Sequence, residues 1–278
     1  MKADVRTIVL DIEGTTTPIA FVYDVLFPFA RRRLRAYLIA SKNRDALREP
    51  LERLREEWTI DPDHGPPEGG HDLRPEYAYP GHGHLSRDED PSSAAGSQVG
   101  ADLESVATYV TWLIDQDRKS TGLKLLQGLV WEEGYRNGEL KGEVFSDVAP
   151  ALRRWRDAGV AVAIYSSGSE LAQRLLFGST ASGDLTPLLA RFFDTTVGAK
   201  QAAESYRRIA RALGTSPDQM LFISDVTTEL DAAHSAGIQV LLCVRPGNRP
   251  QPNHAYPVIE SFDGVDRIAG FEVSSERT

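Results

Sequence analysis

The sequence predicts an α/β fold: a Rossmann-like three-layer core built on a parallel sheet, with a helical cap inserted after the first strand. Three observations lead to this prediction. Short apolar runs end abruptly at polar or small residues, which is typical of parallel strands buried on both faces. Helical patterns alternate with these runs from residue 147 onward, which indicates βαβ units. More than a hundred residues separate the first two runs, whereas a βαβ unit needs only about 30.

The predicted strands end at residues that can do chemistry. In a parallel sheet, ligands gather just beyond the carboxyl ends of the strands. Asp11, Ser166 and Asp225 follow three of the runs, so we expect these side chains at one edge of the sheet. The predicted strands cover residues 7–10 (TIVL), 160–165 (VAVAIY), 192–193 (FF), 220–223 (MLFI) and 238–244 (IQVLLCV).

Glycines end several of the helices predicted between the strands. Gly159, Gly214 and Gly237 each follow a helical pattern, at a position that favours a residue able to adopt a left-handed conformation. Apolar residues at helical spacing also predict helices inside the insertion. The predicted helices of the core cover residues 148–156, 170–177, 202–213 and 230–236, and those of the insertion cover 26–38, 103–114 and 123–135.

We therefore expect a catalytic core from residues 1–16 and 145–278, with residues 17–144 as the inserted cap. The helices of the insertion could instead pad the sheet, but the insertion leaves and returns at the catalytic edge, which favours a cap. Residues 61–100 hold six prolines, seven glycines and four of the six histidines. A tract so poor in large apolar residues predicts a mobile loop at about 61–100.

The charge balance excludes several kinds of partner. Forty acidic residues against 31 basic ones give a net charge of −9, which repels phosphate backbones and anionic lipid at long range. We therefore expect no nucleic-acid partner and no membrane partner, since no run approaches the about 18 apolar residues of a membrane span. The only cysteine, Cys243, and the lack of a signal-peptide pattern predict a cytoplasmic protein. Nothing demands more than a monomer.

Residues 11–15 (DIEGT) are the most informative segment. An aspartate at a strand end, followed by a glycine turn, is held rigidly and can attack a phosphorus atom, and water then hydrolyses the aspartyl-phosphate. Glu13 points to the same side as Asp11, and a second carboxyl group can protonate the leaving oxygen and later activate the water. Taken alone, the segment also fits an ordinary Asp–Gly turn with an exposed glutamate.

Asp225 adds the group that makes a metal site. Two carboxylates facing a phosphate need a counter-charge, and Asp225 completes an oxygen-rich site suited to Mg²⁺. The ion would screen the repulsion between Asp11 and the phosphate. Glu229 lies one helical turn after Asp225. It could orient a metal-bound water by contacting that water directly, or by contacting a side chain that binds the metal. It could equally be a solvated acid that complements the helix dipole.

Two further segments suit a phosphate group. Residues 166–169 (SSGS) end a strand and enter a helix, where a hydroxyl and backbone N–H groups make an anion cradle. Within it, Ser169 is better explained as a helix cap. Lys200 begins another helical stretch, where a surface lysine would be ordinary. As a phosphate ligand it would offset the carboxylates and hold the substrate's oxygens.

These four segments, in this order, resemble the haloacid dehalogenase superfamily of aspartate-nucleophile phosphohydrolases. A closer resemblance is to the enolase-phosphatases of the methionine salvage pathway. Most of the superfamily has aspartate where Glu13 stands, so the glutamate points to this branch. The similar segments are residues 11–19 (DIEGTTTPI), 165–169 (YSSGS), 175–178 (LLFG), 204–207 (ESYR), 224–227 (SDVT) and 244–248 (VRPGN). They span nearly the whole chain except the 61–100 tract and the tail.

The resemblance implies a two-step reaction on 2,3-diketo-5-methylthiopentyl-1-phosphate, which is enolised and then cleaved to acireductone and phosphate. It also implies one Mg²⁺ per chain, held by Asp11, Glu13 and Asp225. The substrate contacts that it implies are Ser166, Ser167 and Lys200. A proton next to a carbonyl becomes acidic when a cation or donor stabilises the enolate oxygen, and Mg²⁺ and Lys200 are the candidates. The residues do not name the base.

Two other functions fit parts of the pattern. The first is a capped Mg²⁺-dependent phosphatase that acts on another small phosphate ester without an enolase step. The second is a phosphorylatable receiver domain, which also carries a strand-end aspartate but is compact and lacks an inserted cap. A degenerate binding protein fits less well, because no essential group is missing. The extra methylene of Glu13 could serve the enolisation, or it could re-aim the carboxylate at the metal.

Overall fold

The structure is a computed structural model of the chain, and it describes residues 5–40, 44–60, 91–116, 118, 120–251 and 254–269. The chain divides into two compact units. The first consists of residues 1–26 and 134–278, and the second of residues 27–133. The second unit falls within the predicted insertion, but whether it covers the site stays a prediction.

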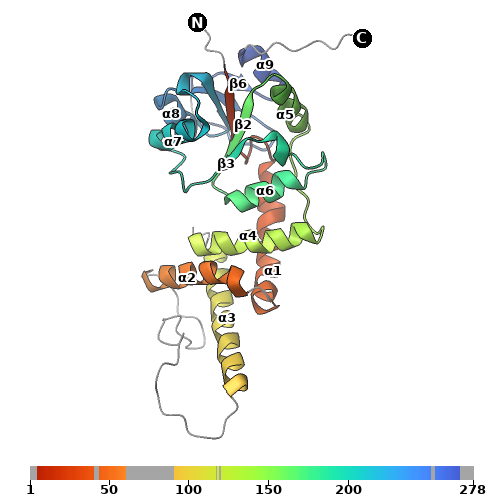
Figure 1. Cartoon of the computed structure of the whole chain (residues 1–278), viewed down its shortest axis with the longest axis vertical. Coiled ribbons are helices and arrows are strands. Elements are labelled where there is room, and N and C mark those ends of the chain that lie inside the picture. Colours follow the sequence, from red (N-terminus) through yellow and green to blue (C-terminus); the bar gives the residue numbers. More distant parts are fainter. Residues whose placement is uncertain are drawn as a thin grey trace. The chain divides into compact units, whose positions relative to one another are not determined.

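A six-stranded sheet forms the centre of the first unit (Figure 1). All neighbouring strands pair in parallel, in the order β3-β2-β1-β4-β5-β6. The chain order reverses between β1 and β4, and α/β sheets bind ligands at such a reversal, outside the carboxyl ends of the strands. The strands are β1 (Thr7–Leu10), β2 (Ala161–Tyr165), β3 (Arg191–Phe193), β4 (Met220–Ser224), β5 (Gln239–Cys243) and β6 (Val258–Ile259).

Helices cover both faces of the sheet and so make three layers (Figure 1). α7 and α8 lie on one face, and α5 and α9 lie on the other. The side chain of Asp266 joins α9 to α5, because it accepts hydrogen bonds from Trp155 Nε1 at 2.7 Å and Arg154 Nε at 3.1 Å. The helices of this unit are α5 (Val148–Asp157), α6 (Glu170–Gly178), α7 (Ala203–Leu213), α8 (Thr227–Ser235) and α9 (Asp263–Ala269), with short 3-10 turns at Thr186–Leu188 and Pro217–Gln219.

Aromatic side chains fill the space between the sheet and α7. The ring of Tyr206 lies edge-on to Tyr165 and to Phe222, with centroids 5.5 and 5.0 Å apart. All three side chains are buried. Such rings dominate the energetics of a core and favour edge-to-face contacts. The packed rings therefore stabilise β2 and β4 close to the strand ends that carry the site.

The second unit is helical. It contains α1 (Phe27–Ala40), α2 (Arg44–Ile60), α3 (Pro91–Asp115) and most of α4 (Thr121–Arg136). Glu57 of α2 caps the start of α4, where its Oε1 accepts hydrogen bonds from the backbone N–H of Thr121 at 2.7 Å and Gly122 at 3.3 Å. A Cβ at Gly122 would lie 2.7 Å from the backbone nitrogen of Leu54, so only glycine lets α2 and α4 approach this closely.

The predicted α/β fold of the core is confirmed, including its five predicted strands and four predicted helices, with shifts of a few residues at the ends. Gly214 ends α7 with a left-handed φ of 64°, as predicted. The sheet has one strand more than predicted, because β6 is a two-residue edge strand. A segment that short carries no periodic pattern for a sequence to reveal.

The insertion departs further from the prediction. α2 was not predicted, and Pro50 lies inside it, a residue that normally argues against a helix. α1 was expected to begin at residue 26, but a π-helix over Phe21–Leu26 precedes it, and such a helix breaks the ordinary 3.6-residue spacing. A mobile loop was predicted at about 61–100. Residues 61–90 of that loop lie outside the described residues. The last ten residues of the predicted loop belong to α3, so the prediction is wrong there: the helix predicted over residues 103–114 extends back to Pro91, and proline is tolerated in the first turn of a helix.

Candidate active site

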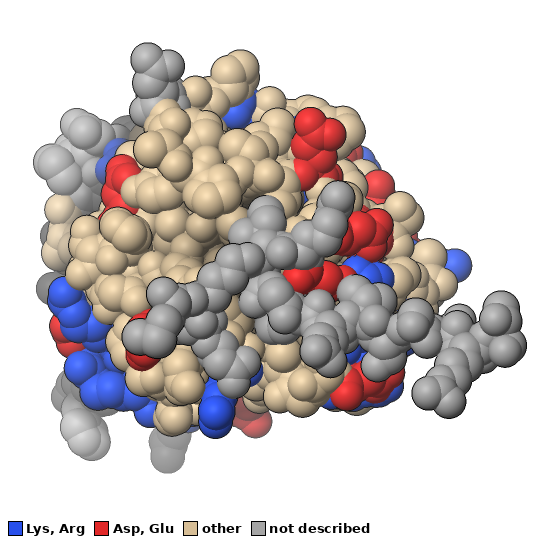
Figure 2. Space-filling view, turned by 90° about the horizontal axis from the view of Figure 1, so that it is seen from above, with Lys and Arg blue, Asp and Glu red and all other residues tan. Residues whose placement is uncertain are grey.

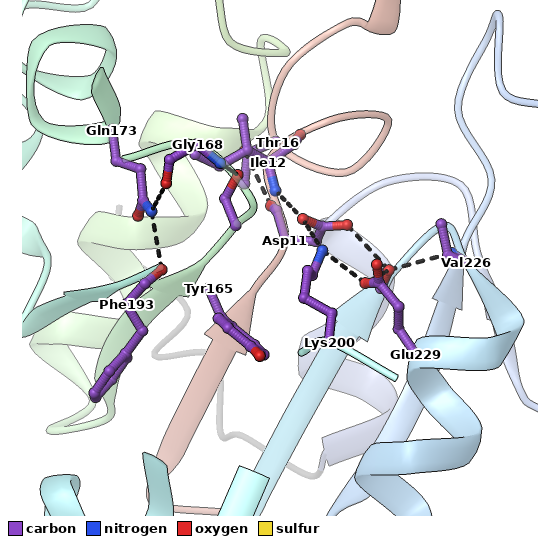
Figure 3. Close-up of polar contacts among 12 residues, drawn as sticks. Asp11, Ile12, Thr16, Tyr165, Gly168, Gln173, Phe193, Lys200, Val226 and Glu229 are labelled. Carbon is purple, nitrogen blue, oxygen red and sulfur yellow. Dashed lines mark hydrogen bonds and ion pairs between the residues drawn. The ribbon is translucent and has the colours of Figure 1, made fainter. Parts of the chain in front are cut away.

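Asp11 stands at the reversal of the strand order, directly after β1. Its backbone N–H continues the sheet by donating to the carbonyl of Ile223 in β4 at 3.0 Å. Its carboxylate is almost completely buried, with 4% of the residue exposed. Oδ1 accepts from the backbone N–H of Ile12 at 2.7 Å, and Oδ2 accepts from Ser224 Oγ at 3.1 Å. Asp11 is therefore held in one orientation at the end of its strand (Figure 3).

Lys200 lies against this carboxylate. Its Nζ is 2.6 Å from Asp11 Oδ1 and 2.7 Å from Glu229 Oε2 (Figure 3). Burial by itself lowers the pKa of Lys200, but the two carboxylates outweigh it and raise the pKa above its ordinary value. Lys200 is therefore a permanent cation, 7% exposed, between two acids.

Glu229 faces the site rather than the solvent. Only 6% of the residue is exposed, and Oε2 accepts from Ser224 Oγ at 3.0 Å as well as pairing with Lys200. Burial, followed by the charge of Asp11, raises the pKa of Glu229 to about 7, although Lys200 lowers it. The interpretation of Glu229 as a solvated acid at a helix start is therefore wrong.

Ser224 is a residue of the site that the sequence did not reveal. Its hydroxyl lies between Asp11 Oδ2 and Glu229 Oε2, and it accepts a hydrogen bond from the backbone N–H of Val226 at 3.2 Å. A hydroxyl has one proton to donate, so only one of the two carboxylates receives it at a time. The available signal was a serine at the buried end of a strand that leads into an acidic residue.

Asp225 and Glu13 complete the acidic group around Asp11. Asp225 Oδ2 lies 2.4 Å from the point that a Cβ at Gly14 would occupy, so the turn after Glu13 packs directly on Asp225. Burial, followed by the charge of Asp11, raises the pKa of Asp225 to about 7. Burial and the charge of Asp11 also raise the pKa of Glu13, which Lys200 lowers.

These carboxylates suit a hard divalent cation. Mg²⁺ prefers oxygen ligands and usually takes one or two carboxylates together with several waters. Lys200 already occupies a cation position beside Asp11. In the part of the chain that the structure describes, no three His, Cys, Asp or Glu side chains converge closely enough to hold a metal by themselves. The donor set therefore fits a Mg²⁺ held by this acidic group together with waters, rather than a fully protein-caged metal.

Residues 166–169, here called the serine loop, lie at the end of β2, which pairs with β1 in parallel register. Ser166 is buried, and its Oγ accepts from the backbone N–H of Gly168 at 3.2 Å, while Ser167 is exposed. Ser169 caps α6 by accepting from the N–H of Ala172 at 3.3 Å, as predicted. Neighbouring parallel strands lie about 4.8 Å apart, so the sheet brings this loop next to Asp11.

Gln173 holds the serine loop through its side-chain amide. The sequence did not reveal this residue either. Its side chain is 1% exposed, and Nε2 donates to the carbonyls of Gly168 and Phe193, both at 2.9 Å (Figure 3). A glutamine within the predicted helix over residues 170–177 was the only sign of it in the sequence. Gln173 therefore ties the loop after β2 to the end of β3.

The segment after β5 fastens the turn that follows Asp11. Asn248 Nδ2 donates to the carbonyl of Gly14 at 2.9 Å, and Arg245 Nε donates to the carbonyl of Thr15 at 3.2 Å. Arg245 Nη2 also lies 2.9 Å from Asp147 Oδ2, with its guanidinium between the rings of Phe145 and Phe262. Residues 245–248 therefore hold in place the turn that carries Glu13.

On the face that Figure 2 shows, acidic and basic side chains both occur among the described residues. Among the described helices, none is both long enough and apolar enough to cross a lipid bilayer.

Without metal, we expect the free energy of unfolding to fall as the pH rises from about 5 to 7. The pKa of Asp225 is about 7 in the folded protein and near its ordinary 3.8 in the unfolded chain. In this range the folded state therefore holds a proton that the unfolded state has released, and linkage makes stability decrease with pH. Asp225→Asn removes this titration, so its stability curve should be flatter.

Urea unfolding of both proteins in EDTA, between about pH 4 and 8, measures the difference. Identical slopes for the variant and the unmodified protein would mean that Asp225 titrates normally in the folded state.

Comparison with known proteins identifies the family. The family model of haloacid dehalogenase-like hydrolases matches residues 5–237. Enolase-phosphatase E1 of Synechococcus elongatus is 44% identical over 263 residues, which cover 95% of this chain and 98% of the relative. The chain belongs to the enolase-phosphatases of the haloacid dehalogenase-like hydrolase family. It is therefore a phosphatase of the hydrolase class.

Other enolase-phosphatase relatives agree over the same length. The enolase-phosphatase E1 of Drosophila virilis is 40% identical over 92% of this chain and 93% of its own. In Vitis vinifera, a protein named as a probable bifunctional methylthioribulose-1-phosphate dehydratase/enolase-phosphatase E1 is 43% identical over 94% of this chain, which spans only 47% of that longer protein. The crystal structure of the UTR4 protein from Saccharomyces cerevisiae aligns with a TM-score of 0.65 and 30% identity, covering 93% of this chain and 99% of that one.

Proposed function

We propose that this enolase-phosphatase enolises 2,3-diketo-5-methylthiopentyl-1-phosphate and then hydrolyses the enol-phosphate to acireductone and phosphate. Acireductone formation is a step of methionine salvage. The observation that carries the proposal is the buried strand-end carboxylate of Asp11, fixed by Ile12 and Ser224 and faced by Lys200. We propose that the enzyme acts as a cytoplasmic monomer with one Mg²⁺, a small phosphate substrate and no nucleic-acid or membrane partner.

Asp11 is the nucleophile in this proposal. One of its carboxylate oxygens forms a bond to phosphorus while the bond from phosphorus to the substrate oxygen breaks. The buried hydrogen bonds to Asp11 leave its carboxylate little freedom, so little entropy is lost when it reaches the phosphate. The acyl phosphate is then hydrolysed by water, which returns Asp11 to its carboxylate form.

Glu13 is the acid and base. Burial and the charge of Asp11 raise the pKa of Glu13, which favours its protonated form, so Glu13 can give a proton to the leaving oxygen and then accept one from the attacking water. Its position two residues after Asp11, on a turn fastened by Asn248, supports this assignment.

Lys200, Ser166 and Ser167 hold the phosphate and the substrate's oxygens. The ammonium of Lys200 can move from Asp11 to the incoming phosphate, and there it offsets the negative charge of the carboxylates. In the enolisation, the same cation can stabilise the enolate oxygen as the carbon next to the carbonyl loses its proton. The serine loop contributes N–H groups and a hydroxyl.

We assign the metal to Asp11, Glu13 and Asp225. Glu229 does not bind the metal in this proposal but contacts Lys200 and Ser224 next to these ligands. When bound, Mg²⁺ supplies positive charge that lowers the repulsion between these carboxylates and the phosphate oxygens. Glu229 also holds Lys200 in the site through their 2.7 Å ion pair.

We further propose that residues 17–144 act as a cap that shields the site from bulk water. The compact helical unit of residues 27–133 supports this proposal, because helices that pack on each other form a body of their own. The capping of α4 by Glu57 shows the same internal order.

Incubation of the protein with the diketo phosphate and Mg²⁺ tests the function. We expect the enol absorbance to appear first and inorganic phosphate to follow, and EDTA should abolish both. Phosphate release without any enol, in a stopped-flow trace that resolves the first turnover, would favour the alternative phosphatase that has no enolase step.

A matched control is the same reaction with a simple phosphate monoester of similar size. The proposed enzyme should hydrolyse it much more slowly, because that ester cannot form the enol-phosphate. Equal rates on both compounds would contradict the substrate assignment.

A further inference from the structure

The side-chain amide of Asn248 is fixed in one orientation. Nδ2 donates to the carbonyl of Gly14 at 2.9 Å and to the carbonyl of Cys243 at 3.3 Å. An amide nitrogen has two protons, and both are used by these two acceptors. Turning the amide over would place its oxygen against two carbonyl oxygens, so the observed orientation is the only one that the surrounding backbone allows.

The oxygen of this amide and the carboxylate of Asp225 both lie beside Gly14. A Cβ at Gly14 would lie 2.9 Å from Asn248 Oδ1 and 2.4 Å from Asp225 Oδ2, so the two oxygens border the same point. Gly14 itself has a left-handed φ of 70°, and its bare Cα is what lets the turn fit between these side chains. Asn248 and Asp225 therefore both border the turn that carries Glu13, at the edge of the acidic group.

Asn248 Oδ1 is buried and has no hydrogen-bond partner among the described residues. A buried acceptor without a partner is costly, and its usual explanation in a native protein is a water or an ion. Asp225 Oδ2 is also an acceptor when ionised. A water that donates one hydrogen to each oxygen would satisfy both, and its own oxygen would then remain free to bind a cation.

We propose that Asn248 is a positioning residue for the metal site. Its amide nitrogen holds the turn of Gly14 beside Asp225, and its amide oxygen accepts a hydrogen bond from a water of the ion's hydration shell. This inference rests on the proposed Mg²⁺-dependent function. Some groups do not touch the metal but hydrogen-bond to its ligands. Removing such a group typically weakens metal binding by about 10- to 100-fold.

Calorimetric titration of the metal-free protein with MgCl₂ alone tests the proposal, and it needs no substrate. Asn248→Ala should weaken Mg²⁺ binding by about 10-fold or more. Asn248→Asp replaces the amide donors with a carboxylate oxygen that the carbonyls of Gly14 and Cys243 repel, so it should be less stable than the unmodified protein. It keeps an oxygen acceptor and adds negative charge to the acidic group, so its Mg²⁺ affinity should be no lower than that of the unmodified protein. Asn137→Ala, at an exposed asparagine of the same unit, is the matched control and should bind normally.

Thermal unfolding of each metal-free variant separates binding from folding. If Asn248→Ala does not fold, Asn248→Asp alone decides, since a folded Asn248→Asp protein that loses about 10-fold in affinity would overturn the role of Oδ1. Normal Mg²⁺ affinity in folded Asn248→Ala would overturn the proposal and leave the proposed function standing. Absence of Mg²⁺ binding by the unmodified protein would overturn both.

Discussion

Asp11→Asn is expected to reduce phosphate release by roughly 10⁴-fold or more, the scale seen when a covalent nucleophile is removed. An amide oxygen cannot form a stable acyl phosphate, so the step that Asp11 performs has no substitute in the site. The fold should survive, because asparagine has nearly the same shape and can keep the contacts from Ile12 and Ser224. Inorganic phosphate released from the diketo phosphate is the measurement.

Asp194→Asn is the matched control for this variant. Asp194 also follows a strand of the same sheet, β3, but it accepts from Thr196 in a local turn and does not belong to the acidic group around Asp11. We expect it to retain activity close to that of the unmodified protein. Near-normal turnover by folded Asp11→Asn would exclude Asp11 as the nucleophile.

Lys200→Met is expected to have the second largest effect, on both stability and activity. It removes the cation from between Asp11 and Glu229 and leaves buried carboxylates without compensation. Breaking a buried ion pair in this way typically costs about 3–5 kcal/mol of unfolding free energy. Loss of the charge that faces the phosphate should also lower kcat by about 10²- to 10³-fold.

The pH dependence of Lys200→Met distinguishes this cause from simple loss of packing. Lys200 favours the ionised forms of Asp225 and Glu229, whose pKa values are about 7 even with the lysine present. Without it these acids stay protonated to higher pH in the folded state, so the loss of stability should grow as the pH rises above about 7, where the unmodified protein releases these protons.

Lys141→Met, at an exposed lysine of the same unit, is the control and should unfold like the unmodified protein at every pH. A stability loss in Lys200→Met that stays constant with pH, measured by urea unfolding in EDTA, would show that Lys200 contributes packing rather than charge.

The core of the fold was predictable because its strands are buried on both faces. Runs such as residues 8–10 and 220–223 are apolar throughout and stop at Asp11 and Ser224, so their ends mark the site-bearing edge of the sheet. Lys200 lies outside any strand, in the turn before α7, and its predicted place beside Asp11 depended on the resemblance to known phosphohydrolases.

The residues that sequence reasoning missed act through other residues. Ser224 bridges two carboxylates, Gln173 holds the serine loop, and Asn248 holds the turn of Gly14. Each is a small polar residue whose role depends on a partner more than 30 positions away or on a loop conformation. No spacing within the chain encodes such contacts. The sequence pointed to Glu229 but left its role open. The buried contacts of Glu229 with Lys200 and Ser224 determine that role, and they do not follow from its place at a helix start.

Acid quenching of the enzyme within the first turnover, followed by peptide mass spectrometry, tests the nucleophile most directly. We expect a phosphoryl group on the peptide that contains Asp11, which should form and decay at rates that account for phosphate release, and it should be absent from Asp11→Asn. Release of phosphate in the first turnover with no phosphoryl group on that peptide at any time, or with the group on a different residue, would contradict the account.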